Sequence, residues 1–127
     1  EAADEEQDHL AWCSDRLKEL DNRGSYLDLI WYVNSYLIGK FAAKISDELS
    51  LGFVVETERQ VMEHLDKHLD SMSKDDIKSR KILEVMREEE AHHAQEAIES
   101  GAKELPKIAK VIMKLQSKVM TNMVYYI

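Results

Sequence analysis

Two short stretches, Glu6-Gln7-Asp8-His9 and Glu89-Glu90-Ala91-His92, each place a glutamate three residues before a histidine. On an α-helix, residues i and i+3 lie on one face in successive turns, so the carboxylate and the imidazole of each pair can converge on one ion. Two such helices, completed by glutamates from two other helices, build the di-metal site of carboxylate-rich four-helix bundles. The two stretches therefore predict a helical protein with a shared metal site.

A metal-free reading of the same pattern stays open at this point. The chain has 15 Glu and five His among 127 residues, and His93 also follows a glutamate by three positions. Chance alone gives about 0.6 matches to so short a motif in an acidic chain, against the three that occur. A solvated helix face rich in glutamate can therefore produce this spacing without any metal.

Composition favours long helices in one domain spanning residues 1–127. Apolar residues make up 44% of the chain, and only one Pro and four Gly interrupt it. The formal net charge of −8 excludes a nucleic-acid-binding role, because no basic stripe is present to meet a phosphate backbone. The lone cysteine, Cys13, has no internal partner for a disulfide.

Apolar periodicity predicts five helices, over residues 1–21, 26–46, 51–72, 73–100 and 106 onward. Local signals support their ends. These signals are a glycine cap at Gly24, a capping box from Ser25 to Asp28, a cap at Ser73, a closing glycine at Gly101 and a proline start at Pro106.

Two glutamates stand on apolar helix seams, Glu6 in the first predicted helix and Glu58 in the third. A carboxylate on a buried face is costly unless it is paired or bound to metal. His64 and His68 flank the Glu58 seam, and we expect them to be core histidines or neighbours of ligands. In the fourth helix the register is ambiguous, since two faces fit equally well. One face holds Ile82, Val85, Glu89 and His92, and the other holds Leu83, Met86, Glu90 and His93.

Longer segments of the chain resemble the demethoxyubiquinone hydroxylases, the di-iron monooxygenases of ubiquinone biosynthesis. The similar segments are 5–13 (EEQDHLAWC), 53–61 (FVVETERQV) with His64-Leu65, 86–93 (MREEEAHH), 101–106 (GAKELP) and Met120-Thr121. Together they cover essentially the whole chain, which makes the resemblance far more specific than a single Glu-x-x-His match.

The resemblance implies an all-α, ferritin-like four-helix bundle with additional helices. It places the metal ligands at Glu6, His9, Glu58, Glu89 and His92, and so selects Glu89 over Glu90. It further gives Glu5 and Glu88 the task of orienting the histidines. The family's first helix, which carries one more ligand, has no match here, so we expect the chain to be truncated at its N-terminal side.

The activity implied by the resemblance is hydroxylation of a polyprenyl methoxy-benzoquinol by O2 at two iron ions. Glu6, Glu58 and Glu89 are the expected catalytic carboxylates, and NADH is the external reductant suggested for the family. The expected location is peripheral, on the cytoplasmic face of the cell membrane or on the inner mitochondrial membrane of a eukaryote. The expected partners are the lipid quinol, the membrane surface, and a second copy of the chain or a lipid-presenting protein.

The second predicted helix is rich in aromatic side chains, among them Trp31, Tyr32 and Tyr36. We expect it either to pack as an ordinary helix or to lie on a bilayer, where such residues are favoured. Two alternative functions use the same pattern. One is a ferritin- or rubrerythrin-like protein that handles iron or peroxide, although Cys13 alone cannot build the four-cysteine site of rubrerythrins. The other is a metal-free helical interaction module.

Overall fold

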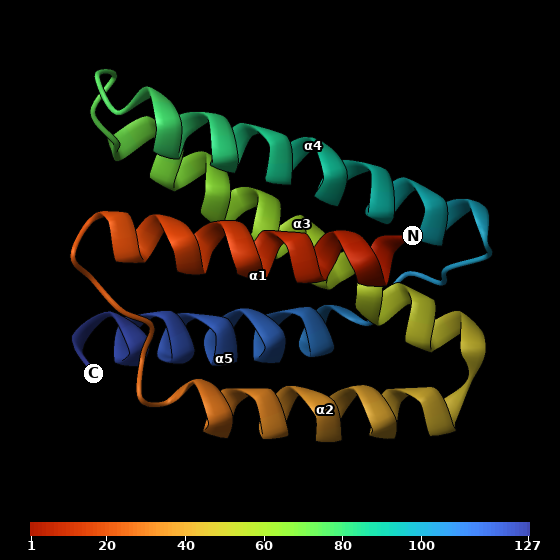
Figure 1. The fold of residues 1–127 in the computed structure, drawn as a ribbon. Helices are drawn as coiled ribbons and strands as arrows, with labels where there is room; N and C mark the ends of the chain where they lie inside the picture. Colours follow the sequence, from red (N-terminus) through yellow and green to blue (C-terminus); the bar gives the residue numbers. More distant parts are fainter. The chain divides into compact units, whose positions relative to one another are not determined.

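A computed structural model describes all of residues 1–127 as five α-helices without a β-strand (Figure 1). The helices are α1 (Ala2–Glu19), α2 (Asp28–Ile45), α3 (Asp47–Ser71), α4 (Ile77–Glu99) and α5 (Lys107–Tyr126). The predicted all-α class is confirmed, and each predicted helix has its counterpart. None of the five combines the length and the apolar character that crossing a bilayer requires.

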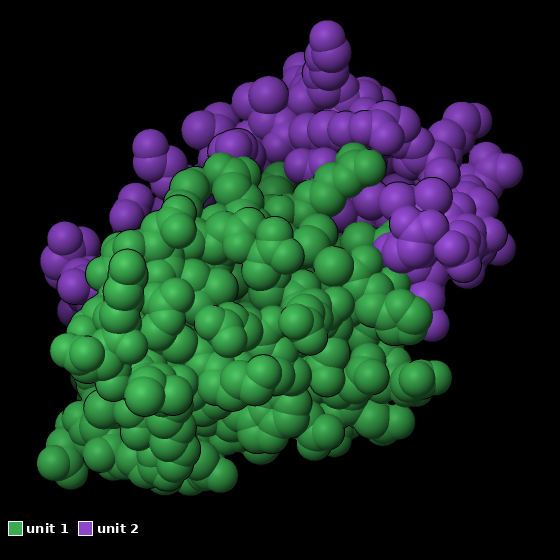
Figure 2. Space-filling model, turned by 90° about the horizontal axis from the view of Figure 1, so that it is seen from above, with its two compact units in different colours: residues 1–24, 58–94 green, residues 25–57, 95–127 purple.

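The chain forms two compact units, coloured separately in Figure 2. The first unit contains residues 1–24 and 58–94, and the second contains residues 25–57 and 95–127. Helices α3 and α4 are each divided between the two units, at residues 57/58 and 94/95. The prediction of one ferritin-like domain over residues 1–127 stays a prediction.

The end of α1 differs from the sequence prediction. The helix ends at Glu19, and Asp21 takes a left-handed backbone conformation with φ of 52°. The backbone N–H of Asn22 then reaches back to the carbonyl of Leu17 at 2.8 Å. This closure is the one that a glycine usually provides. The glycine cap predicted at Gly24 is therefore wrong, because Asp21 has already closed the helix.

Two of the predicted N-terminal caps are also wrong. The Ser25 hydroxyl accepts a hydrogen bond from the backbone N–H of Leu27 at 3.1 Å, and α2 begins without a side-chain cap. Helix α4 is capped by Asp76, which accepts the backbone N–H of Ser79 at 3.1 Å. Ser73 lies in the turn before that helix. At α4, Asp76 lies closer to the first free N–H groups than Ser73 does, and at α2 no side chain caps them.

The signals at Gly101 and Pro106 are confirmed. Gly101 has a φ of 100°, and the N–H of Ala102 bonds to the carbonyl of Ala97 at 3.1 Å, which closes α4. Pro106 directly precedes the first residue of α5. Between α2 and α3 the chain is broken by Ser46, whose hydroxyl accepts the N–H of Leu49 and so starts α3.

Polar clamps hold the helices of the first unit together. The Arg16 guanidinium of α1 donates to Ser79 at 2.8 Å and to Asp76 at 3.0 Å, and so ties α1 to the start of α4. Asp66 of α3 and Arg87 of α4 form a two-pronged ion pair. These contacts fix α1, α3 and α4 side by side, which sets the geometry of the side chains between them.

In the second unit, Gly52 of α3 allows close backbone contact with the segment after α4. The N–H of Lys103 bonds to the carbonyl of Glu48 at 3.0 Å, and a Cβ added at Gly52 would collide with the carbonyl oxygen of Lys103. By contrast, nothing lies within 4 Å of a Cβ added at Gly39 of α2.

We therefore predict opposite effects for two Gly→Ala substitutions. Gly52→Ala should lower the free energy of unfolding by about 1–3 kcal/mol, because the clash forces the backbone apart. Gly39→Ala should leave it equal or raise it by up to about 1 kcal/mol, because alanine is the better helix former and meets open space. Urea unfolding followed by circular dichroism measures both. Equal effects of the two substitutions would contradict this account.

Candidate metal centre

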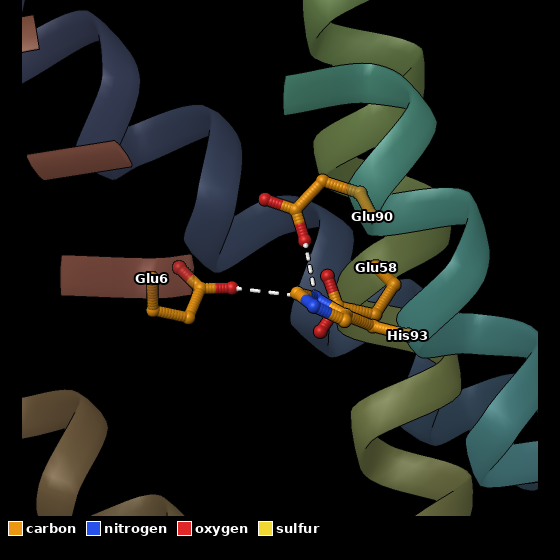
Figure 3. A group of neighbouring side chains, drawn as sticks. All are labelled: Glu6, Glu58, Glu90 and His93. Atoms are coloured by element: carbon orange, nitrogen blue, oxygen red, sulfur yellow. Dashed lines mark hydrogen bonds and ion pairs between the residues drawn. The ribbon is translucent and has the colours of Figure 1, made fainter. Parts of the chain in front are cut away.

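Side chains from three helices converge within the first unit (Figure 3). Glu6 comes from α1, Glu58 from α3, and Glu90 and His93 from α4. One ligand atom of each lies within 4.8 Å of those of the others. Three carboxylates and an imidazole drawn from separate helices form a donor set suited to iron or manganese.

His9 completes this group in a nearly symmetric way. Its Nδ1 lies 3.3 Å from Oε1 of Glu90 and 3.8 Å from Oε2 of Glu6. On the other side, Nδ1 of His93 lies 3.3 Å from Oε2 of Glu90 and 3.8 Å from Oε1 of Glu6. Each of the two carboxylates thus turns one oxygen toward one histidine and its second oxygen toward the other.

The outer nitrogens of both rings are held by glutamates of the facing helix. Nε2 of His9 lies 2.6 Å from Oε2 of Glu89, and Nε2 of His93 lies 2.6 Å from Oε2 of Glu5. A carboxylate on Nε2 places the proton there and leaves Nδ1 as the free donor atom. Nδ1 of His9 then faces the space between Glu6 and Glu90 without a hydrogen bond, whereas Nδ1 of His93 is hydrogen-bonded to Oε2 of Glu90 at 3.3 Å.

Burial and mutual repulsion shift the acids of the group. Glu90 is only 2% exposed. Desolvation raises the pKa of Glu58 to about 9, with a hydrogen bond to Glu90 and the charges of Glu90 and Glu6 acting in the same direction. Desolvation, followed by the charge of Glu90, raises the pKa of Glu6. Carboxylates crowded in this way need protons or cations between them.

The residues fit a metal site. Nδ1 of His9 is buried and has no hydrogen-bond partner, a costly state for a polar atom unless it binds something else. Glu6 and Glu90 each direct one oxygen at His9 and the other at His93, so these four residues would hold bound metal between them. Glu58 belongs to the group that contains His93.

The structure places Glu6, His9 and Glu58 close together, with Glu90 and His93 of α4 beside them. Of the other two predicted ligands, Glu89 contacts the outer nitrogen of His9, and His92 is exposed. Glu90 and His93 belong to the alternative face that periodicity had left open. One residue step turns a helix by about 100°, so only one of the two pairs can face inward.

Other expectations about this region need correction. Glu88 is exposed, and its orienting task is carried by Glu89, whereas Glu5 orients a histidine as predicted. Glu6 is exposed, although its place on an apolar seam predicted a buried acid. His64 and His68 are likewise exposed and are not core residues.

Comparison with known proteins gives a consistent result. A family model described as ubiquinone biosynthesis protein COQ7 matches residues 1–124. The 3-demethoxyubiquinol 3-hydroxylase of Francisella tularensis subsp. tularensis (strain WY96-3418) is 58% identical over 124 residues, which are 98% of this chain and 59% of the relative. The protein of the same name from Francisella philomiragia subsp. philomiragia is 57% identical over the same shares. The chain thus spans 59% of the length of these relatives. No solved structure matches it.

The raised pKa of Glu58 predicts a pH-dependent stability for the metal-free protein. The folded state keeps a proton on Glu58 that the unfolded chain releases above its ordinary pKa of 4.5. This contribution to stability is complete below that value and is lost as the pH rises toward about 9. Glutamine mimics the protonated acid, so Glu58→Gln should lose less stability than the unsubstituted protein between mildly acid and mildly alkaline pH.

Thermal melting in the presence of chelator, recorded across that pH range, measures this difference. Glu88→Gln is the matched control, because Glu88 is an exposed glutamate and its substitution should leave the pH dependence unchanged. Parallel curves for Glu58→Gln and the unsubstituted protein would show that Glu58 does not hold the proton.

Proposed function

Because the chain belongs to the ubiquinone biosynthesis protein COQ7 family, we propose that it hydroxylates a polyprenyl demethoxyubiquinol with O2 at a di-iron centre. The relatives it matches carry the name 3-demethoxyubiquinol 3-hydroxylase. The observation that carries the proposal is the placement of Glu6 and Glu90 between the two Nδ1 atoms of His9 and His93. Each acid turns a different oxygen to each histidine, which offers ligands for two ions.

In this proposal Glu6, Glu90, His9 and His93 would hold the two irons between them. Glu58 serves the iron at His93, because it belongs to the same group of converging ligand atoms. The additional glutamate that the family resemblance implies would then serve the iron at His9. Carboxylate and imidazole donors in this ratio are suited to ferrous and ferric iron.

The protein's own residues position these ligands and hold protons. Glu89 and Glu5 fix the ring planes of His9 and His93 through their Nε2 atoms. Burial by itself would lower the pKa of His93, but its hydrogen bonds to Glu5 and Glu90 outweigh burial and raise it. The hydrogen bond to His93 in turn lowers the pKa of Glu5, which keeps that carboxylate ionised as a partner.

The bound iron pair supplies the electron transfer to O2 that hydroxylation of the quinol ring requires. One oxygen atom enters a ring C–H bond, and the other leaves as water with two protons and two electrons. The proposed source of these two electrons is an external reductant such as NADH.

The second unit supports peripheral binding to a membrane that holds the lipid quinol. No residue of α2 or α5 is buried, and large apolar side chains are exposed along both helices. Such a large exposed apolar surface is typical of proteins that bind a partner or a lipid surface. The exposed residues include Leu29, Ile30, Tyr32, Tyr36 and Phe41 of α2, and Ile108, Ile112, Leu115 and Val119 of α5.

The charge of α5 favours a lipid surface as the partner that covers this exposed apolar surface. Its sequence contains four lysines and no acidic residue, although the whole chain has a formal net charge of −8. The lysines at 107, 110, 114 and 118 recur at helical spacing beside the apolar positions. A helix with an apolar face flanked by lysines is typical of helices that lie on anionic membranes.

The proposed activity is tested by reconstituting the full-length protein with ferrous iron without air, then adding O2 and a short-tailed demethoxyquinol. Mass spectrometry should detect the gain of one oxygen atom in the quinol. Oxidation of iron without hydroxylated product would instead favour a ferritin-like protein, and failure to bind iron would favour a metal-free helical module.

Two neighbouring histidines test the ligand assignment in that assay. His93→Ala should remove at least one of about two irons per chain and reduce hydroxylation by at least about 100-fold, because a ligand of the reacting metal is lost. His92→Ala should keep both the iron and most of the activity. Iron analysis and circular dichroism separate ligand loss from unfolding. The reverse ranking of the two variants would restore Glu89 and His92 as the ligand pair.

Membrane binding is tested with two exposed tyrosines of α2 and two lysines of α5. Tyr32→Ser with Tyr36→Ser should weaken cosedimentation with phosphatidylglycerol-containing vesicles at all salt concentrations, because apolar surface is removed. Lys107→Gln with Lys118→Gln should weaken it mainly at low salt, by about 1 kcal/mol per lysine. Bound iron should be unchanged in both. Unaltered cosedimentation of both double variants would overturn the assignment of this surface.

A further inference from the structure

His64 and His68 form a second histidine cluster that is separate from the candidate metal centre. They lie four residues apart on α3, within the first unit, and both are exposed. Their Nε2 atoms are 3.0 Å apart, and the two rings meet edge to face with centroids separated by 4.4 Å. Neither ring is hydrogen-bonded to a carboxylate, in contrast to the rings of His9 and His93.

We propose that His64 and His68 bind a divalent transition-metal ion as a two-nitrogen chelate, distinct from the di-iron centre. Histidines at i and i+4 project from one face of a helix, the spacing that helical zinc motifs use for their two imidazoles. Two nitrogens so close together have only two stable states, since they must share either a proton or a metal ion.

The separation of the nitrogens fits cis positions around a metal. With metal–nitrogen bonds of about 2.0–2.1 Å, two nitrogens 3.0 Å apart subtend an angle of about 94° at the ion. This angle suits neighbouring positions of a tetragonal or octahedral ion, such as copper(II) or nickel(II). A tetrahedral zinc site would need a separation of about 3.3 Å at the same bond lengths. The remaining positions face solvent, where water can fill them.

The surroundings of His64 keep its imidazole in the form that binds metals. Partial desolvation lowers the pKa of His64, and the charges of His68 and Lys67 lower it further. Lys67 itself is paired with Glu63 at 2.7 Å. A neutral imidazole retains the lone pair that a metal ion needs, so both the spacing and the protonation state favour chelation at neutral pH.

The chemistry of the two sites separates their metals. The candidate metal centre is rich in carboxylates and suits iron or manganese, whereas a pair of imidazoles with water prefers copper or nickel. His64 lies six residues after Glu58 on the same helix, a rise of about 9 Å. An ion on the histidine pair therefore adds to the metal content of the protein without occupying a carboxylate ligand.

Copper(II) added to the full-length, iron-loaded protein tests the proposal. Electron paramagnetic resonance at one equivalent should show a tetragonal copper signal with two nitrogen ligands. His68→Ala should remove the two-nitrogen pattern and weaken copper binding by at least about tenfold in calorimetry, because one of the chelating nitrogens is lost. Lys74→Ala, at an exposed lysine of the turn after α3, should keep both signal and affinity.

Two further measurements keep the test independent of the di-iron proposal. Iron content and hydroxylase activity should be the same in His68→Ala and in the unsubstituted protein. If the iron centre fails to form, copper(II) enters it in both variants alike, so the difference between His68→Ala and Lys74→Ala still reports on the histidine pair. Identical copper spectra and affinities in the unsubstituted protein and His68→Ala would overturn the proposal.

Discussion

The repulsion among three carboxylates is the constraint on which the first unit depends. Glu6, Glu58 and Glu90 bring ligand atoms within 4.8 Å of one another and of His93. Without a cation, desolvation and then this crowding raise the pKa values of Glu58 and Glu6 and so favour their protonated forms. Bound metal would replace those protons and turn a costly cluster into the link between three helices.

The polar clamps around the cluster explain how the helices hold it before any metal binds. Arg16 ties α1 to α4, and the ion pair between Asp66 and Arg87 ties α3 to α4. The acids are therefore placed by contacts that do not involve the ligands themselves. Such preorganisation lowers the cost of ordering the site when ions enter.

The sequence predicts the helices and most of the site well, because amphipathic periodicity and ligand spacing are local properties. It fails at helix ends, where Asp21 and Asp76 take roles assigned to Gly24 and Ser73. These ends depend on which side chain reaches the first free backbone groups, and periodicity does not encode that choice. The resemblance identified the family, now supported by a match over residues 1–124. Its choice of Glu89 and His92 in the fourth helix stays a prediction, because the structure gathers Glu90 and His93 instead.

A signal for the face of α4 that turns inward was present in the sequence. From Glu90 and His93 the same helix face continues to Ala94 and Ala97, both of which are buried. From Glu89 and His92 it continues to Glu96, which is exposed. A pair of small apolar residues one and two turns on indicates an inward face more strongly than another glutamate does.

The reciprocal contacts between α1 and α4 depend on the register that α4 adopts in the structure. Each helix offers one glutamate to the shared centre and a preceding glutamate to the outer nitrogen of the other helix's histidine, Glu5 to His93 and Glu89 to His9. A slip of one residue in α4 would turn Glu90 away from the centre. It would also remove Glu89 from His9. The contacts of Glu90 with the two histidines and the orientation of the His9 ring would then be lost together. The consecutive glutamates in each stretch therefore have different roles, and their order along the helix determines which of them can bind metal.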